Sequence, residues 1–158
     1  MPAAAQDRSS PIDEDAGVTD YAIRTDLAAM DLDLVHEWLS TDAYWSLGRS
    51  RAAVATAAEH SLNVGAFTDD GRQVAYARVV TDHATFAWLC DVYVDRDHRG
   101  RGLGKRLVAA VAERVDELGV GRTLLKTRDA HQVYAGHGFE PVPDPGLWMI
   151  RTPGSATS

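Results

Sequence analysis

The chain has 158 residues, which is enough for one domain with a single hydrophobic core and too short for two ordinary domains. Apolar residues make up 45% and charged residues 25%, a globular composition that excludes a fibre, and no apolar run approaches the roughly 18 residues of a membrane span. The formal net charge of −7 argues against general nucleic-acid binding, and a single cysteine, Cys90, excludes an internal disulfide framework and a cysteine-built zinc site.

The two ends of the chain are expected to lie outside the folded domain. Residues 1–19 are rich in Ala, Pro, Ser and Asp, have no apolar period, and lack the basic and apolar parts of a signal peptide. We therefore expect a disordered tail over 1–19, a single domain over 20–152 and a second tail over 153–158. A chain of this kind is expected to be soluble and cytoplasmic.

Apolar periodicity predicts the order β-α-α-β-β-β-α-β-α-β-β. Asp31 and Ser50 can cap the first two helices, and Gly119 ends a long helix that starts near Gly102. Short polar turns join the second, third and fourth strands, which predicts an antiparallel meander. The strands are expected at 21–24, 62–68, 73–81, 85–94, 123–127, 139–142 and 148–151, and the last two helices at 102–118 and 130–137.

The segment with the clearest chemical meaning is the glycine segment, residues 99–106, which reads Arg-Gly-Arg-Gly-Leu-Gly-Lys-Arg. Residues 96–106 carry a net charge of +4, whereas residues 1–95 carry −10. Glycines let backbone N–H groups approach a ligand closely, and the N-terminus of the following helix adds unpaired donors and partial positive charge. The segment therefore predicts a phosphate or pyrophosphate site, although it matches neither a P-loop nor the dinucleotide-binding fingerprint.

Two motifs together resemble the signatures of the GNAT superfamily of N-acetyltransferases. A Val-Tyr-Val strand at 92–94 followed by the glycine segment is similar to its acetyl-CoA-binding signature, and Tyr134 shortly before Gly138-Phe139 is similar to its second signature. The order of elements is also similar from residue 21 to residue 151. The resemblance implies an α+β, three-layer fold, in which helices flank a mixed, mostly antiparallel twisted sheet and a splayed pair of parallel strands holds the coenzyme.

The resemblance implies acetyl-CoA as co-substrate. The backbone amides of residues 99–105 would hold the pyrophosphate, and main-chain groups of strand 92–94 would pair with the pantetheine arm. Thr127 stands where the family often has Asn, and its hydroxyl can bond the pantetheine or the neighbouring loop. The histidines show no ligand spacing, so no metal is expected. The expected coenzyme-binding residues are Val92, Tyr93, Val94, Arg99, Gly100, Arg101, Gly102, Leu103, Gly104, Lys105 and Thr127.

Two side chains are candidates for the chemistry of acyl transfer. By resemblance, Tyr134 is the acid that protonates the departing coenzyme A sulfur, and a phenol with an ordinary pKa of about 10 keeps its proton at neutral pH. Asp91 lies in the middle of an apolar strand, where alternation places it on the face opposite Cys90 and Val92. Asp91 either deprotonates the amine, binds the ammonium, or pairs with an arginine.

The acceptor is expected to be an amine in a pocket with aromatic walls. By resemblance, the segments after the first strand shape this pocket, and here they contain Tyr44 and Trp45, with Trp88 as a further candidate. The acidic balance of residues 1–95 favours a cationic acceptor, either a small molecule or a peptide. Neither nucleic acid nor a membrane is expected as a partner. Dimers are common in the family, so a homodimer is compatible with the resemblance.

The activity that the resemblance implies is transfer of an acetyl group from acetyl-CoA to a primary amine within a ternary complex. Two alternatives stay open at this point. The chain is a non-catalytic, regulatory module that binds acyl-CoA, or it is a transferase that uses a larger acyl donor. Release of free thiol from acetyl-CoA with a panel of amines would distinguish an enzyme from a binding module.

Overall fold

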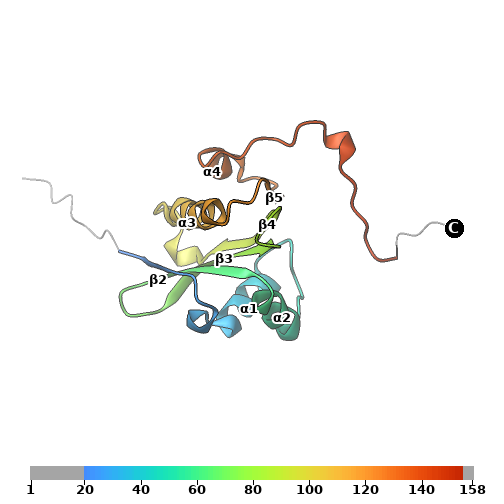
Figure 1. The fold of residues 1–158 in the computed structure, drawn as a ribbon. Coiled ribbons are helices and arrows are strands. Elements are labelled where there is room, and N and C mark those ends of the chain that lie inside the picture. Colours follow the sequence, from blue (N-terminus) through green and yellow to red (C-terminus); the bar gives the residue numbers. More distant parts are fainter. Residues whose placement is uncertain (1–19, 155–158) are drawn as a thin grey trace, which may run out of the picture.

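A five-stranded sheet in the order β1-β2-β3-β4-β5 is the middle layer of the computed structural model, which describes residues 20–154 (Figure 1). The tail predicted over 1–19 lies outside the described residues. β1 to β4 are antiparallel neighbours, and β4 pairs with β5 in parallel. In chain order, the elements are β1 (Ala22–Arg24), η1 (Leu27–Ala29), α1 (Leu32–Thr41), α2 (Arg51–Glu59), β2 (Leu62–Phe67), β3 (Gln73–Thr81), β4 (Ala87–Val94), η2 (Arg96–His98), α3 (Leu103–Leu118), β5 (Thr123–Leu125), α4 (His131–Ala135) and η3 (Pro145–Leu147).

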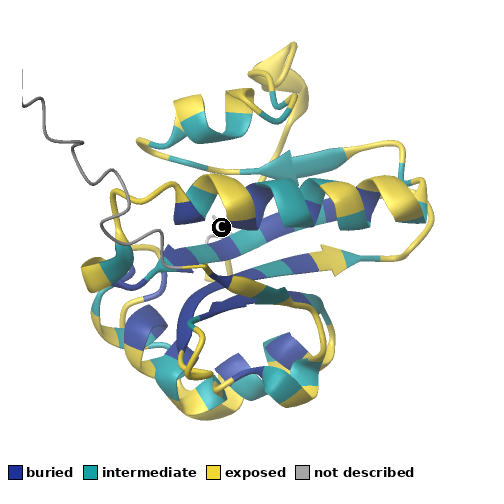
Figure 2. Cartoon of the chain, turned by 90° about the vertical axis from the view of Figure 1, so that its left-hand side faces the viewer, coloured by how far each residue is buried: buried dark blue, intermediate teal, exposed yellow. Residues whose placement is uncertain are grey.

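Helices cover both faces of the sheet. α1 and α2 lie on one face, whereas α3 and α4 lie on the other (Figure 1). On the first face, Trp38 of α1 stacks on Tyr93 of β4 with ring centroids 5.2 Å apart. On the second face, Leu107 and Val111 of α3 pack in one core with Leu89 of β4, and buried residues follow the inner sides of the layers (Figure 2). This three-layer, mostly antiparallel architecture confirms the fold class that the sequence predicted.

The first helix boundaries follow from the capping residues. Asp31 Oδ1 accepts a hydrogen bond of 3.1 Å from the Leu34 N–H, and Ser50 Oγ accepts one of 3.1 Å from the Ala53 N–H. Each bond satisfies a donor of the first helical turn that has no partner within the helix. Gly119, at φ +69°, ends α3 in the left-handed conformation that glycine adopts without steric cost. These three boundaries confirm the sequence prediction.

The parallel pair of β4 and β5 separates after three residue pairs. The register runs from Ala87 opposite Thr123 to Leu89 opposite Leu125, where β5 ends, while β4 continues to Val94. Beyond Leu89, the main chain of β4 therefore has no strand neighbour on the β5 side within the described residues. This confirms the splayed strand pair, and it opens a gap next to the glycine segment.

A β-bulge in β4 decides where Asp91 points. Arg78 lies opposite Cys90 and Tyr76 lies opposite Tyr93, so β4 has one residue more than β3 between these two pairs. Asp91 takes φ +53°, and its side chain reaches Arg78, the register partner of Cys90. The prediction that Asp91 faces away from Cys90 is therefore wrong, because the extra residue interrupts the alternation of side chains along the strand.

The two strands predicted at 139–142 and 148–151 are not formed. After α4, the chain runs away from the sheet, and the only helix or strand within residues 139–154 is the short η3 (Figure 1). Leu147, Met149 and Ile150 of this segment are exposed. An alternating apolar pattern produces a strand only where the segment meets the edge of a sheet, and this segment does not meet one here.

Two strand boundaries differ from the prediction by two residues, and the start of β1 and the end of β2 differ by one. β4 begins at Ala87 instead of residue 85, because Asp82 Oδ1 accepts hydrogen bonds of 2.9 Å and 2.8 Å from the N–H groups of Ala84 and Thr85 and closes a turn. β5 ends at Leu125 instead of residue 127. The shorter β5 lengthens the unpaired part of β4.

No helix within residues 20–154 is long and apolar enough to cross a membrane. The cytoplasmic location and the domain limits at residues 20 and 152 stay predictions.

Candidate active site

One cavity of about 1200 Å³ brings together most of the residues that the sequence singled out. The glycine segment and the second half of β4 form part of its lining, and residues 125–130, from the end of β5 onward, line it together with Tyr134. The loop between α1 and α2 contributes Tyr44, Trp45 and Arg49. The cavity therefore follows the gap between β4 and β5 and joins it to the predicted acceptor residues.

The glycine segment presents main-chain donors to this cavity. Gly100 and Gly102 have φ +76° and +75°, and Gly102 caps α3 without a side-chain hydrogen bond. A Cβ built on Gly104 would lie 3.9 Å from Val94 Cγ2, so the absence of a side chain leaves the first turn of α3 open. Unpaired N–H groups and the positive end of a helix dipole form a site for an anion. The segment therefore fits the diphosphate of coenzyme A.

The charged side chains of the glycine segment differ in their relation to the cavity. Arg99 lines it and is held in place, because its Nε donates to the Val94 carbonyl at 2.9 Å and its Nη2 donates to Asp42 Oδ2 at 3.3 Å. Arg101 and Lys105, predicted to bind the coenzyme, do not line the cavity. Arg99 is therefore the charged side chain of this segment that borders the cavity.

The residues predicted to hold the pantetheine arm all border the strand gap. The group that lines the cavity comprises Val92, Tyr93, Val94 and Thr127. The Tyr93 ring is buried on the α1 side, where its hydroxyl donates to Asp42 Oδ2 at 2.6 Å, so Tyr93 offers the gap its main chain. Thr127 Oγ1 accepts a hydrogen bond of 3.0 Å from the Ala130 N–H. Its hydroxyl thus bonds the neighbouring loop, one of the two contacts expected of it.

Tyr134 of α4 lines the cavity with a half-buried ring. The ring makes an edge contact with Phe139, with centroids 5.9 Å apart. Burial raises the pKa of the Tyr134 phenol above its ordinary value, and the neighbouring Tyr44 and Asp129 raise it further. The hydroxyl therefore keeps its proton at neutral pH, as a proton donor requires.

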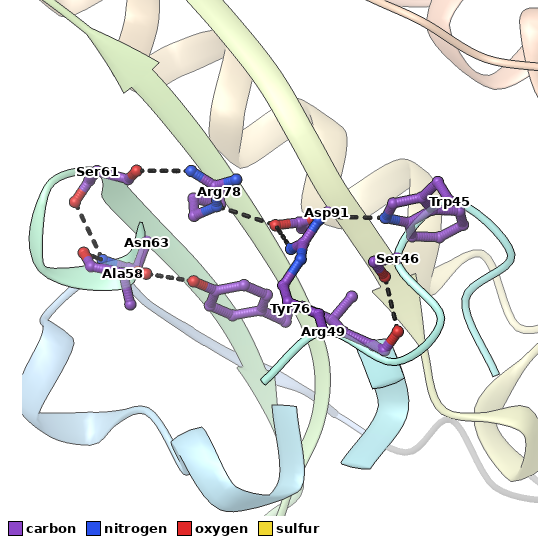
Figure 3. Close-up of polar contacts among 10 residues, drawn as sticks. Trp45, Ser46, Arg49, Ala58, Ser61, Asn63, Tyr76, Arg78 and Asp91 are labelled. Carbon is purple, nitrogen blue, oxygen red and sulfur yellow. Dashed lines mark hydrogen bonds and ion pairs between the residues drawn. The ribbon is translucent and has the colours of Figure 1, made fainter. Parts of the chain in front are cut away.

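Asp91 is buried and holds three side chains (Figure 3). Trp45 Nε1 donates to its Oδ1 at 3.0 Å, while Arg49 Nη1 and Arg78 Nε donate to its Oδ2 at 2.6 Å and 2.9 Å. Burial by itself raises the pKa of Asp91, but the hydrogen bonds and charges of the two arginines outweigh it and hold the pKa below its ordinary value. Among the three roles left open by the sequence, pairing with arginine is the one for which the structure contains the contacts.

The predicted acceptor side chains lie along the same cavity. Tyr44 and Trp45 are in edge contact, with ring centroids 5.1 Å apart. Arg128 lies over the Tyr44 ring, 3.8 Å from its centroid, and Trp88 lines the cavity from β4. The aromatic residues predicted from different parts of the sequence therefore meet around one space.

A family model described as the acetyltransferase (GNAT) family matches residues 32–139. The chain belongs to the GNAT family of acetyltransferases. It is an acyltransferase, the class of enzyme that the paired motifs predicted, and the family uses acetyl-CoA as acyl donor.

Similar proteins span most of this GNAT acetyltransferase. A crystal structure of a protein belonging to the GNAT family, from Xanthomonas campestris pv. campestris, is 44% identical with a TM-score of 0.81 and covers 90% of this chain and 100% of its own. The protein FG08082 of Gibberella zeae, whose name assigns it to the acetyltransferases, is 25% identical over 162 residues, or 86% of this chain and 92% of FG08082. The fold is also similar to that of N-acetylglutamate synthase from Neisseria gonorrhoeae, whose crystal structure is a complex with coenzyme A and N-acetyl-glutamate. That protein is 18% identical with a TM-score of 0.64, and the match covers 78% of this chain and 29% of the synthase.

The partners of Asp91 in this GNAT acetyltransferase could not be identified from the sequence. Arg78 is 13 positions from Asp91 and Arg49 is 42 positions away. A carboxylate within an apolar strand indicates that a partner exists, but no local pattern says which residue it is. Asp42, which holds Arg99 and Tyr93 beside the cavity, gave no sequence signal of its own.

Proposed function

We propose that this GNAT acetyltransferase transfers an acetyl group from acetyl-CoA to a primary amine within a ternary complex. The observation that carries the proposal is a single cavity that contains the glycine segment, the gap between β4 and β5, and Tyr134. When bound, acetyl-CoA supplies a thioester carbonyl that an amine can attack, so that a C–N bond forms and the C–S bond breaks. Direct transfer needs both substrates in one space, and this cavity of about 1200 Å³ joins the strand gap to the predicted acceptor residues.

The main chain around the gap would hold the co-substrate. The N–H groups at the start of α3 and the Arg99 guanidinium would bind the diphosphate. The main-chain groups of Val92 and Val94, which have no β5 neighbour, would pair with the amides of the pantetheine arm. Main-chain donors of the same part of β4 would stabilise the oxyanion that develops during transfer.

Tyr134 would donate the proton that the departing sulfur takes up. Its raised pKa keeps the phenol neutral, and its ring is fixed against Phe139. A positioned general acid accelerates such a step by roughly 10²–10⁴-fold. The Tyr134 hydroxyl is thus proposed as the catalytic acid of the reaction.

Asp91 would be a positioning residue and not the base. A general base must take up a proton near neutral pH, whereas the pKa of Asp91 lies below its ordinary value and both of its oxygens accept hydrogen bonds. By holding Trp45, Arg49 and Arg78, Asp91 would fix the shape of the cavity wall. The proton of the amine would then pass to water in the cavity.

The test of the proposed function is acetyl transfer by the purified full chain. Thiol release from acetyl-CoA should depend on an amine from a broad panel, and mass spectrometry should find one acetyl group added to that amine. Calorimetry should detect coenzyme A binding to the same preparation. Binding of coenzyme A with no transfer to any amine would show that the acceptor is not an amine of the panel or that the acyl group is not acetyl, and no binding at millimolar coenzyme A would refute the proposal.

The substitution Gly104→Ala is expected to separate coenzyme affinity from stability. The added methyl would make an ordinary contact with Val94 at 3.9 Å, and alanine is a better helix former than glycine by up to about 1 kcal/mol, so the free energy of unfolding should not fall. The same methyl would occupy the space above the first turn of α3, and coenzyme A affinity should drop about tenfold, or about 1.4 kcal/mol. Urea unfolding and calorimetry measure the two effects.

Gly121→Ala is the matched control for this prediction. A Cβ at Gly121 would meet no atom within 4 Å, and Gly121 does not line the cavity. Coenzyme A affinity should be unchanged in this variant. Equal affinities for Gly104→Ala and the unmodified chain would show that the coenzyme does not approach the main chain at Gly104.

We also propose that two copies of the chain associate through the segment after α4. The exposed fractions of the residues Leu147, Met149 and Ile150 are 80%, 98% and 87%, and such a run of apolar surface is stabilised by burial against another molecule. A second copy offers the same segment, so a symmetric contact covers both. Analytical ultracentrifugation should find a dimer for the full chain and a monomer for the double variant Met149→Ser and Ile150→Ser. A monomeric full chain would contradict the proposal.

A further inference from the structure

Arg49, Arg78 and Asp91 form a cluster of two guanidinium groups and one carboxylate in the wall of the cavity (Figure 3). The exposed fraction of the Asp91 side chain is 2%, and those of Arg49 and Arg78 are 24% and 14%. Within residues 20–154, no second carboxylate lies within ion-pair distance of either guanidinium. Because charged groups that are withdrawn from water need a counter-charge, the cluster is left with one uncompensated positive charge.

The two guanidinium groups also keep hydrogen-bond donors that the protein does not use. Arg49 donates to Asp91 from Nη1. Arg78 donates to Asp91 from Nε and to Ser61 Oγ from Nη1, the latter at 3.1 Å. Each arginine, however, carries five N–H groups. In the described part of the chain, every buried side-chain nitrogen has a hydrogen-bond partner. Three nitrogens make none of these bonds: Nε and Nη2 of Arg49 and Nη2 of Arg78. Because a buried nitrogen would have a partner, these three must be accessible, and both residues line the cavity.

The other charged residues of the cavity do not supply the missing negative charge. Asp129 pairs with its neighbour Arg128 at 3.8 Å, and Asp42 pairs with Arg99 at 3.3 Å. Lys126 adds a further positive charge to the lining. Basic side chains thus outnumber acidic ones along the cavity, although residues 1–95 as a whole are acidic.

We infer that the Arg49–Arg78 cluster binds an anionic group, a carboxylate or a phosphate, on the amine acceptor. The inference rests on the proposed function, because it names the class of acceptor for the same cavity. A planar guanidinium presents paired N–H groups that match the oxygens of either anion. The acceptor is then an amine that carries its own negative charge, and not the purely cationic amine that the charge of residues 1–95 favoured.

The inference is tested with pairs of amines that differ in one anionic group. Amino acids are compared with their amides, and aminoalkyl phosphates with the corresponding amino alcohols, at saturating acetyl-CoA. We expect kcat/KM to be at least about tenfold higher for the anionic member, and the series that shows the preference identifies carboxylate or phosphate as the group bound. Equal or higher kcat/KM for the neutral members in both series would overturn the inference.

The variant Arg49→Gln tests the site itself. It leaves Asp91 and Arg78 as a pair with no net charge, so the fold should be retained. We expect KM for the anionic acceptor to rise about tenfold or more, with little change in kcat or in coenzyme A affinity. Arg51→Gln is the matched control, because Arg51 pairs with the exposed Asp33 at 2.6 Å and does not line the cavity; its kinetics should match those of the unmodified chain.

A binding measurement separates failure of the inference from failure of the proposed function. Calorimetry with the same amino acids and aminoalkyl phosphates should detect binding to the unmodified chain, and Arg49→Gln should weaken this binding about tenfold or more, whether or not transfer occurs. If binding is found without transfer, the anion site stands and the proposed function fails. If neutral amines are acetylated and no anionic compound binds, the proposed function stands and the anion site is refuted.

Discussion

Replacing Tyr134 with phenylalanine is expected to lower kcat for acetyl transfer by about 10²–10⁴-fold, because the departing sulfur loses its proton donor. The aromatic ring stays and keeps its edge contact with Phe139, so the fold should be retained. The affinity for coenzyme A should change little, since the missing hydroxyl acts on a bond that breaks only during the reaction. Steady-state kinetics and calorimetry on the same preparation measure the two quantities.

Tyr21→Phe is the matched control for this result. It also removes one phenol hydroxyl, which in Tyr21 bonds His98 Nδ1 at 2.8 Å. His98 lines the cavity next to the glycine segment, whereas Tyr21 itself does not line it. Its kcat should therefore be close to that of the unmodified chain. A Tyr134→Phe variant that keeps its full kcat would show that another group protonates the sulfur.

The pH dependence of kcat gives a second measure of the same role. Burial raises the pKa of Tyr134 above its ordinary value of about 10, so the phenol is protonated and active throughout the neutral range. The Tyr134 contribution to kcat should be lost only as the pH rises above about 10. The Tyr134→Phe variant should lack this alkaline decline, and a decline near pH 7 to 8 that depends on Tyr134 would contradict the direction of the pKa shift.

Replacing Asp91 with asparagine is expected to lower the free energy of unfolding by about 3 kcal/mol, because it breaks a buried ion pair. This value is the low end for such a loss, since both arginines reach the cavity and are not fully buried. Asparagine has the same shape and tolerates the left-handed backbone at φ +53°, so the loss reports the charge and not backbone strain. Arg49 and Arg78 would be left as two positive charges without a carboxylate. Urea unfolding at neutral pH measures the change.

Asp33→Asn provides the contrast at the surface. Asp33 also pairs with an arginine, Arg51, at 2.6 Å, but its side chain is exposed. Water and salt screen such a pair, so its removal should leave the free energy of unfolding almost unchanged. Equal small losses for the two variants would show that the Asp91 cluster does not stabilise the fold.

The sign of the pKa shift sets the pH at which the Asp91 contribution disappears. The pKa of Asp91 is lower in the folded chain than its ordinary value of 3.8, so the unfolded chain binds the proton more readily. The stabilisation that Asp91 contributes is therefore complete above about pH 5. It is lost as the pH falls below about 4 and through the pKa that Asp91 has in the folded chain. Asp91→Asn should show a smaller loss of stability over this acid range than the unmodified chain.

Those features of this GNAT acetyltransferase that depend on neighbouring residues could be predicted from the amino-acid sequence. Asp31 and Ser50 cap their helices through bonds that span three positions. Gly100 and Gly102 allow the left-handed backbone before α3, and Tyr134 lies a few positions from the Phe139 ring that it contacts. Local steric limits and local hydrogen bonds determine these features, and they can be read from a short window of the chain.

Features that depend on contacts between residues distant in the sequence could not be predicted in this way. The bulge in β4 arises from its pairing with β3 and turns Asp91 toward Arg78, and the loop after α1 brings Arg49 to the same carboxylate across 42 positions. The apolar residues after α4 have the alternation of strands, yet they meet no sheet edge and form none. Ion pairing and strand pairing both need a partner within a few ångströms, and the folded chain alone determines which groups come that close.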